Sequence, residues 1–293
     1  MRMRLTTAFK ERLKIKQRII SGAVLVVVMG LVFWGIYTPI FGIFFGLLSA
    51  MASYEILKVT KVQNKEVKAI SISFAFIVPL YLEYGCRFPF GIALLIFIFA
   101  LLLIMLANHE NTRFEQIAIA IYASVFIPFC FSTFILVRDL FKMYPNEINK
   151  MNALFLVIIG VSCSWLTDTC AYFVGVKFGK HKMSPVISPK KSIEGAVGGV
   201  VGCLALNMLI LYLFNTYIFD TPFMSYLVFA PISIVLSLAS MCGDLVASII
   251  KRNYGAKDYS NLIPGHGGIM DRFDSCLFVM PILYIVITII HSF

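Results

Sequence analysis

Long apolar stretches separated by short polar segments dominate the pattern of this chain. Nine stretches are long enough to cross a membrane as helices, since about 20 apolar residues span the hydrocarbon core. Their apolar residues are continuous rather than alternating, which favours helices over the strands of a membrane barrel. The predicted spans are 19–38, 40–57, 69–86, 88–107, 116–137, 152–176, 194–218, 223–249 and 274–292. We therefore expect an all-α integral membrane protein with about nine transmembrane helices.

The composition supports this assignment. Of the 293 residues, 60% are hydrophobic and only 14% are charged, which is too little charge for the surface of a soluble protein of this size. Seven cysteines are scattered without a CxxC pair or a Cys/His cluster, so neither a zinc site nor a disulfide framework is indicated. The N-terminus is basic for too long to resemble a cleaved signal peptide. We expect a basic cytoplasmic segment over 1–18 and a single polytopic membrane domain over 19–293.

The net charge of +10 is unevenly distributed along the chain. If the N-terminus is cytoplasmic, 21 of the 25 Lys and Arg residues fall in the inner segments, and only Arg87, Arg138, Lys142 and Lys150 fall in the outer ones. By the positive-inside rule, this asymmetry predicts an N-in, C-out topology. The basic character therefore indicates topology and attraction to anionic lipid rather than to nucleic acid. Some of these cations are also candidates for binding a phosphate-rich substrate.

Polar residues within the predicted spans gather in two clusters, both in the half from about 152 to 293. The first cluster contains Asp168, and an intramembrane carboxylate usually faces a cavity or a partner. Hydroxyl and ammonium groups just before a helix N-terminus suit a phosphate. The candidate substrate-binding residues here are Asp168, Tyr172, Ser188, Lys190, Lys191, Ser192 and Glu194. The alternative is a solvated positive-inside loop followed by a Ser-x-Glu helix start.

The second cluster runs from Gly243 to Asp274. One stripe along the eighth span carries a carboxylate, a hydroxyl and two cations, and a glycine-rich turn follows before the ninth span. The candidates are Asp244, Ser248, Lys251, Arg252, Lys257, Asp258, His266, Gly267, Gly268, Asp271, Arg272 and Asp274. Asp271 and Asp274 lie three residues apart, which predicts one helix face at the start of the ninth span.

Such a set of residues favours phosphate chemistry. Carboxylates from two consecutive helices, here Asp244 and Asp271, can hold a hard cation such as magnesium. Surrounding lysines and arginines would neutralise a polyphosphate, as nucleotidyl or phosphoryl transfer requires. The alternative is structural: Asp271 pairs with Arg272 or Arg252, and the glycines only form a turn. Two further intramembrane carboxylates, Glu55 and Glu83, receive no role, although a nearby lysine is a possible partner for Glu55.

The run SIIKRNYGAKDYSNLIPGHGGIMDRFD, residues 248–274, resembles the signature of the phosphatidate cytidylyltransferases, also called CDP-diacylglycerol synthases. That signature requires Ser, Lys-Arg, Lys-Asp, His-Gly-Gly and Asp-Arg-x-Asp at set spacings, and every fixed position is present. The upstream run from Asp168 to Gly199 resembles a second block of that family, and the two blocks cover about a fifth of the chain.

The resemblance implies that CTP and phosphatidic acid give CDP-diacylglycerol and pyrophosphate, with magnesium and in a homodimer. It implies that Asp244 and Asp271 bind the metal and that Ser248, Lys251 and Arg252 belong to the same site. The remaining signature positions are Lys257, Asp258, His266, Arg272 and Asp274. A requirement for a second, monovalent cation is left open. We expect a cavity at the cytoplasmic ends of spans six to nine, in a bacterial inner membrane, where CTP and the lipid meet.

Three other functions are weighed against this one. A CDP-alcohol phosphatidyltransferase needs an Asp-Gly-x2-Ala-Arg motif followed by two spaced aspartates, and this motif is missing from the sequence. A CTP-dependent polyprenol kinase is disfavoured by the complete signature, and product analysis would separate the two activities. A transporter predicts polar residues spread through the membrane depth and related broken spans, whereas here the polar residues gather at one face.

Overall fold

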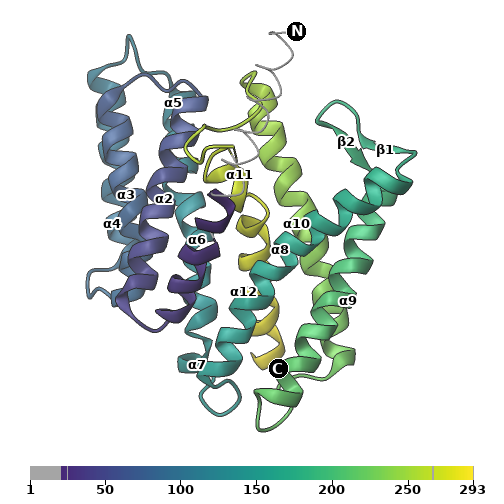
Figure 1. Cartoon of the computed structure of the whole chain (residues 1–293). Helices are drawn as coiled ribbons and strands as arrows, with labels where there is room; N and C mark the ends of the chain where they lie inside the picture. The colour runs from purple at the N-terminus through teal and green to yellow at the C-terminus, as the bar shows by residue number, and fades with distance from the viewer. Residues whose placement is uncertain (1–20, 25, 266, 293) are drawn as a thin grey trace. The chain divides into compact units, whose positions relative to one another are not determined.

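The computed structural model describes residues 21–292 apart from 25 and 266 (Figure 1). The expected basic segment 1–18 lies outside the described residues. The chain forms two compact units. Unit 1 comprises the chain as far as Phe129 together with Tyr254–Arg272, and unit 2 comprises Cys130–Asn253 and Phe273–Phe293. The signature segment is therefore divided between the two units.

Seven helical spans in the described part of the chain are long and apolar enough to cross a membrane. They are α2 (Pro39–Val59), α3 (Lys65–Tyr84), α4 (Phe90–Ala107), the continuous run of α5 (Phe114–Ile121), η1 (Tyr122–Phe126) and α6 (Ile127–Arg138), then α8 (Lys150–Phe178), α9 (Ile193–Tyr217) and α10 (Tyr226–Asn253). The first and ninth predicted spans correspond to shorter apolar helices, Ser21–Trp34 and α12 (Cys276–Ser292). The prediction of an all-helical membrane protein is thus confirmed, with seven long spans and two shorter apolar helices among the residues that the structure describes.

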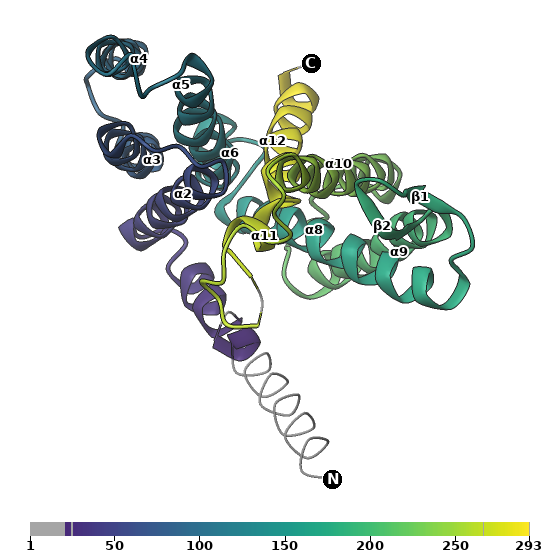
Figure 2. The same ribbon diagram turned by 90° about the horizontal axis from the view of Figure 1, so that it is seen from above.

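Unit 1 is built around α2 and α3, which pack along each other and lie side by side in Figure 2. The Asn64 side chain caps α3 by accepting hydrogen bonds from the backbone N–H groups of Glu66 and Val67, at 2.9 and 3.2 Å, which satisfies donors that a helix start leaves open. Helix α4 contacts α3, and α5 contacts α2, α3 and α4. In the fifth span, Pro128 lacks an N–H group, and a π-helical turn directly precedes it.

Unit 2 is built around α8 and α9, which approach each other closely through small residues. A Cβ atom added at Gly195 would lie 2.8 Å from the backbone oxygen of Ala171, and one at Gly199 would lie 2.9 Å from that of Thr167. Helix α10 packs on both helices, and α12 packs on α10 and α8. Buried hydroxyls of Thr167 and Ser237 join α8 to α10 at 2.8 Å, which satisfies two polar groups inside the bundle.

The segment between α8 and α9, expected to be a loop, contains an antiparallel hairpin of β1 (Lys182–Ser184) and β2 (Ser188–Ser192) (Figure 1). Lys182 pairs with Ser192, and Ser184 pairs with Ser188. These strands have no alternating apolar residues, so the usual pattern of a strand is missing from their sequence. The hairpin ends at Ser192, whose hydroxyl accepts a hydrogen bond from the N–H of Gly195 and caps α9.

Two short helices complete the chain: α7 (Leu140–Met143) and α11 (Met270–Phe273). A turn at Asp274 and Ser275 separates α11 from α12. The prediction that Asp271 and Asp274 share one face at the start of the ninth span is therefore wrong. Asp271 lies on α11 in unit 1, and Asp274 lies in the turn that belongs to unit 2.

Candidate functional site

In unit 2, the two polar clusters of the sequence meet. The ammonium group of Lys191 on β2 forms an ion pair with the carboxylate of Asp244 on α10. On the same face of α10, the Ser248 hydroxyl donates a long hydrogen bond of 3.4 Å to Asp244. Both partners of the ion pair are about a quarter exposed, at 24% each. The hairpin therefore brings a cation to the intramembrane carboxylate of the eighth span.

In unit 2, the charges of two aspartates act on a third, Asp274. The Ser275 hydroxyl donates to Asp168 on α8 at 3.2 Å, and the Ser275 N–H donates to Asp274 at 2.8 Å. Burial and then the charge of Asp244 raise the pKa of Asp274 to about 7, with Asp168 adding to the shift and Lys251 opposing it. The negative charges of Asp244 and Asp168 thus act on Asp274 within one cluster of carboxyl groups, which a bound cation would stabilise.

The last turn of α10 adds two cations to this cluster. Lys251 is buried at 8% exposure, and its charge acts on Asp274. Arg252 is exposed. Positive side chains at a helix C-terminus interact favourably with the helix dipole, so both residues are compatible with α10 while remaining suited to a phosphate.

In unit 1, Asp271 holds the backbone of residues 254–270, which lead from the end of α10 to the first residue of α11 and which we call the signature loop. One of its carboxylate oxygens accepts the N–H groups of Tyr259 at 2.8 Å and of Gly268 at 3.0 Å. The loop closes on itself through a bridge between Ile263 and Gly267. Gly267 has φ +86°, a conformation that side-chain-bearing residues rarely adopt. The glycine turn is therefore structurally required in this loop.

Glu55 on α2 is the residue that sequence reasoning left without a role. Its side chain is 1% exposed, and it accepts hydrogen bonds from the Ser260 hydroxyl at 2.5 Å, the Ile269 N–H at 3.0 Å and the Met270 N–H at 2.9 Å. Its hydrogen-bond partners are therefore groups of the signature loop rather than the suggested lysine. The sequence did contain a signal that Glu55 has a specific partner, because a carboxylate within an apolar span is energetically costly. Glu83, the other unexplained carboxylate, packs against Gly42.

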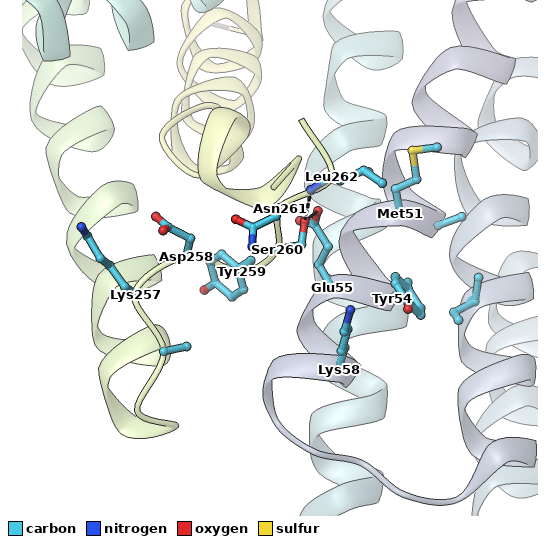
Figure 3. Close-up of a pocket in the computed structure, with 13 residues that line it drawn as sticks. Met51, Tyr54, Glu55, Lys58, Lys257, Asp258, Tyr259, Ser260, Asn261 and Leu262 are labelled. Carbon is cyan, nitrogen blue, oxygen red and sulfur yellow. Dashed lines mark hydrogen bonds between the residues drawn. The ribbon is translucent and has the colours of Figure 1, made fainter. Parts of the chain in front are cut away.

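A cavity of about 890 Å³ lies beside Glu55 in unit 1 (Figure 3). We call it the α2 pocket. Its lining residues are Ala50, Met51, Tyr54, Glu55 and Lys58 of α2, Ile72 of α3, and Ala256, Lys257, Asp258, Tyr259, Ser260, Asn261 and Leu262 of the signature loop. Two signature residues, Lys257 and Asp258, therefore line it. Apart from this loop, its walls come from the second and third predicted spans, not from spans six to nine.

Other predicted site residues have different surroundings. Tyr172 is 66% exposed and contacts the ring of Phe173. Glu194 accepts hydrogen bonds from the backbone of Lys180 and His181 and from the His181 ring, so it fastens the segment between α8 and β1 to α9. Ser188 is half-buried on β2, and Lys190 is exposed there. Arg272 is exposed on α11, and His266 lies outside the described residues.

The carboxylates of these polar clusters are the candidate ligands for a metal ion. Among the residues that the structure describes, no group of three or more His, Cys, Asp or Glu side chains has the geometry to hold a metal. Magnesium rarely needs such a cage, since one or two carboxylates with water and substrate phosphates usually suffice. Of the two predicted ligands, Asp244 lies in unit 2 and Asp271 lies in unit 1, and each provides the carboxylate oxygen that magnesium prefers.

Comparison with known proteins supports the reading of the signature. The model of the cytidylyltransferase family matches residues 16–290. The phosphatidate cytidylyltransferase of Bacillus subtilis is 34% identical over 284 residues, which cover 94% of this chain and 98% of the relative. That of Thermotoga maritima is 30% identical over 84% of this chain and 88% of the relative.

The phosphatidate cytidylyltransferase of Staphylococcus saprophyticus has a higher sequence identity, 43%, over a shorter alignment of 145 residues, which is half of this chain. The long matches carry the assignment because they cover both units and both polar clusters. The chain therefore belongs to the cytidylyltransferase family, and within it to the phosphatidate cytidylyltransferases.

Proposed function

We propose that this enzyme transfers the cytidylyl group of CTP to phosphatidic acid, with the aspartates and cations of residues 244–274 as its catalytic residues. The observation that carries this proposal is the complete signature within a chain that aligns with phosphatidate cytidylyltransferases over most of its length. The products are CDP-diacylglycerol and pyrophosphate.

The reaction requires cations more than it requires a base. An ionised phosphate oxygen of phosphatidic acid attacks the α-phosphorus of CTP, and a new P–O bond forms. The bond from the α-phosphorus to the bridging oxygen breaks, and pyrophosphate leaves with that electron pair. Because both reactants are anions, Lys251 and Arg252 would offset their repulsion, and Lys191 would add to this positive field.

Asp244 and Asp271 are the proposed magnesium ligands, as the family resemblance implies. Bound magnesium would neutralise triphosphate oxygens and favour the departure of pyrophosphate. Asp168 and Asp274 would add negative potential near Asp244, and Ser248 would orient that carboxylate through its hydrogen bond. Whether activity also requires a second, monovalent cation is tested by replacing the monovalent ion in the assay buffer.

We further propose that the N-terminus is cytoplasmic and that the site faces the cytoplasm of a bacterial inner membrane. The charge distribution supports this orientation, since 21 of 25 Lys and Arg residues then lie inside. CTP would arrive from the cytoplasm, and the lipid would arrive within the inner leaflet. The family resemblance also implies a homodimer.

The test is transfer of cytosine-labelled CTP into lipid by membranes that contain the full chain, phosphatidic acid and magnesium. Label should enter a CDP-lipid with the wild type, and it should be lost with EDTA and with Asp271→Asn. Asp220→Asn is a matched control, because it removes the same charge from an exposed loop position. Transfer of γ-label from CTP to a polyprenol would replace this function with kinase activity. Movement of neither label in folded protein would refute enzymatic use of CTP.

A further inference from the structure

One wall of the α2 pocket is formed by side chains that follow one another along a single face of α2. Met51, Tyr54 and Lys58 are spaced by three and four residues, so they follow one face of α2. Met51 and Tyr54 are 42% and 47% exposed, and Lys58 is exposed in the last turn. At 1.5 Å per residue, the stripe is about 10 Å long. It passes from an apolar side chain through an aromatic ring with a polar tip to a cation.

The opposite wall repeats this combination of apolar and cationic groups. Leu262 is 54% exposed, and Lys257 is exposed on the signature loop. Of the two carboxylates in the lining, Glu55 is directed to the loop (Figure 3). Its oxygens accept three hydrogen bonds there. Asp258 is exposed to solvent, where its charge is screened. The pocket therefore offers two solvent-accessible ammonium groups beside exposed apolar surface.

We propose that the α2 pocket binds the lipid substrate, a diacyl lipid with an anionic phosphomonoester headgroup. The phosphate lies at Lys58, the glycerol region lies at Tyr54, and the first part of an acyl chain lies along Met51 and Leu262. This assignment rests on the proposed function and adds the location of its lipid.

The order of groups along α2 is the reason to choose a lipid over a nucleotide. A phospholipid in a bilayer presents acyl chain, glycerol and phosphate in sequence along the membrane normal, and tyrosine is enriched at the interface between them. Helix α2 is an apolar span that ends beside Lys58, so the stripe follows the same direction. A nucleotide has no partner for exposed Met51. The cavity volume lies within the usual range of about 300–1,000 Å³ for small-molecule sites, so the remaining acyl chain would stay in the bilayer.

Lys58→Met tests the proposal, because it removes the charge and keeps an unbranched side chain. We expect the KM for phosphatidic acid, measured as its mole fraction in mixed micelles at saturating CTP, to rise about tenfold, as loss of a charged hydrogen bond predicts. The KM for CTP should change less than about twofold, and Lys58→Arg should restore lipid binding. Lys65→Met is the matched control, since it removes one exposed charge from unit 1 outside the pocket.

Three outcomes of this experiment would overturn the proposal. Lys58→Met could affect the KM for the lipid no more than Lys65→Met, which would show only general attraction to anionic micelles. It could raise the KM for CTP instead, which would assign Lys58 to the nucleotide. Lys58→Arg could fail to restore binding in a folded protein. Absence of any CDP-lipid with the wild type would instead refute the proposed function.

A second measurement does not depend on turnover. Wild-type enzyme without CTP is irradiated with phosphatidic acid that carries a diazirine in its acyl chain, and labelled peptides are identified by mass spectrometry. We expect label at Met51 or Tyr54, competed by unlabelled phosphatidic acid, not competed by phosphatidylcholine, and reduced in Lys58→Met. Label confined to peptides outside the α2 pocket would overturn the assignment.

Discussion

The carboxylates of unit 1 and those of unit 2 have different partners. In unit 1, Glu55 and Asp271 accept backbone N–H groups and hold the signature loop in place. In unit 2, Asp244 forms an ion pair with Lys191. Asp168 and Asp274 accept hydrogen bonds from Ser275, and the charge of Asp244 raises the pKa of Asp274. The same type of side chain thus fixes backbone in one unit and concentrates charge in the other. Asp271 is also a proposed magnesium ligand, so its loss should affect both activity and stability. Changes at Glu55 and at Asp244 should separate the two effects.

Asp244→Asn should have the largest effect, and the effect should be on activity. The variant removes negative charge from the proposed magnesium ligands, and we expect cytidylyl transfer to fall by about 10²- to 10³-fold, as for loss of one strong electrostatic contact. Thermal unfolding in detergent should change little, because Asp244 and its ion-pair partner Lys191 are each a quarter exposed, and a solvent-accessible ion pair contributes little to stability. Labelled transfer and the unfolding temperature are measured on the same preparation. Activity within tenfold of the wild type would remove Asp244 from the catalytic residues.

Glu55→Gln should affect stability first. The amide keeps the size of the side chain but places a donor where two N–H groups and a hydroxyl require acceptors. A buried donor left without an acceptor costs about 1–3 kcal/mol, so the unfolding temperature in detergent should fall. Glu66→Gln is the control, since Glu66 is exposed in unit 1. An unchanged unfolding temperature for Glu55→Gln would show that the loop does not depend on this contact.

Gly268→Ala tests the same contact from the loop side. An added Cβ would lie 2.5 Å from a carboxylate oxygen of Glu55, so Glu55 or the loop must move. Overpacking of this kind costs about 1–3 kcal/mol, and we expect the lower end because the obstructing group is the tip of a side chain. Gly91→Ala is the control, because a Cβ there has no heavy atom within 4 Å. Equal unfolding temperatures for the two variants would contradict the close packing of Gly268 on Glu55.

Local pattern predicted most of the helices but few of these contacts. Each long span follows from about 20 neighbouring apolar residues, which is a property of a short window. The turn at Asp274 and Ser275 ends that regularity, so the helix α12 begins at Cys276 and not at 274. The loop partners of Glu55 lie more than 200 residues away along the chain, and no local pattern indicates them. The meeting of Lys191 with Asp244 likewise depends on a hairpin whose strands have no alternating apolar residues.

The sequence of the signature nevertheless located residues that the fold gathers together. Asp244 and Ser248 are four residues apart, and the helical period alone predicts their contact. Lys251 follows at i+7 and acts on Asp274. Tyr172 lies four residues after Asp168, so the same period predicts one shared face, yet its side chain is exposed. Helical spacing predicts which residues share a face, but the neighbours of that face depend on tertiary packing.

Ser192→Ala should have the smallest effect, and it separates a structural from a substrate-binding role. Ser192 was a candidate for phosphate binding, yet its hydroxyl accepts the N–H of Gly195 and caps α9. Loss of an N-cap costs about 1 kcal/mol, so the unfolding temperature should fall slightly, whereas Ser184→Ala on β1 should leave it unchanged. The KM for CTP is measured in parallel. If the cap is its whole role, that KM stays within about twofold of the wild type, below the roughly tenfold change expected for a lost hydrogen bond to a charged group. A large rise in KM at an unchanged unfolding temperature would return Ser192 to the substrate site, and the hairpin would then serve catalysis through its hydroxyl as well as through Lys191.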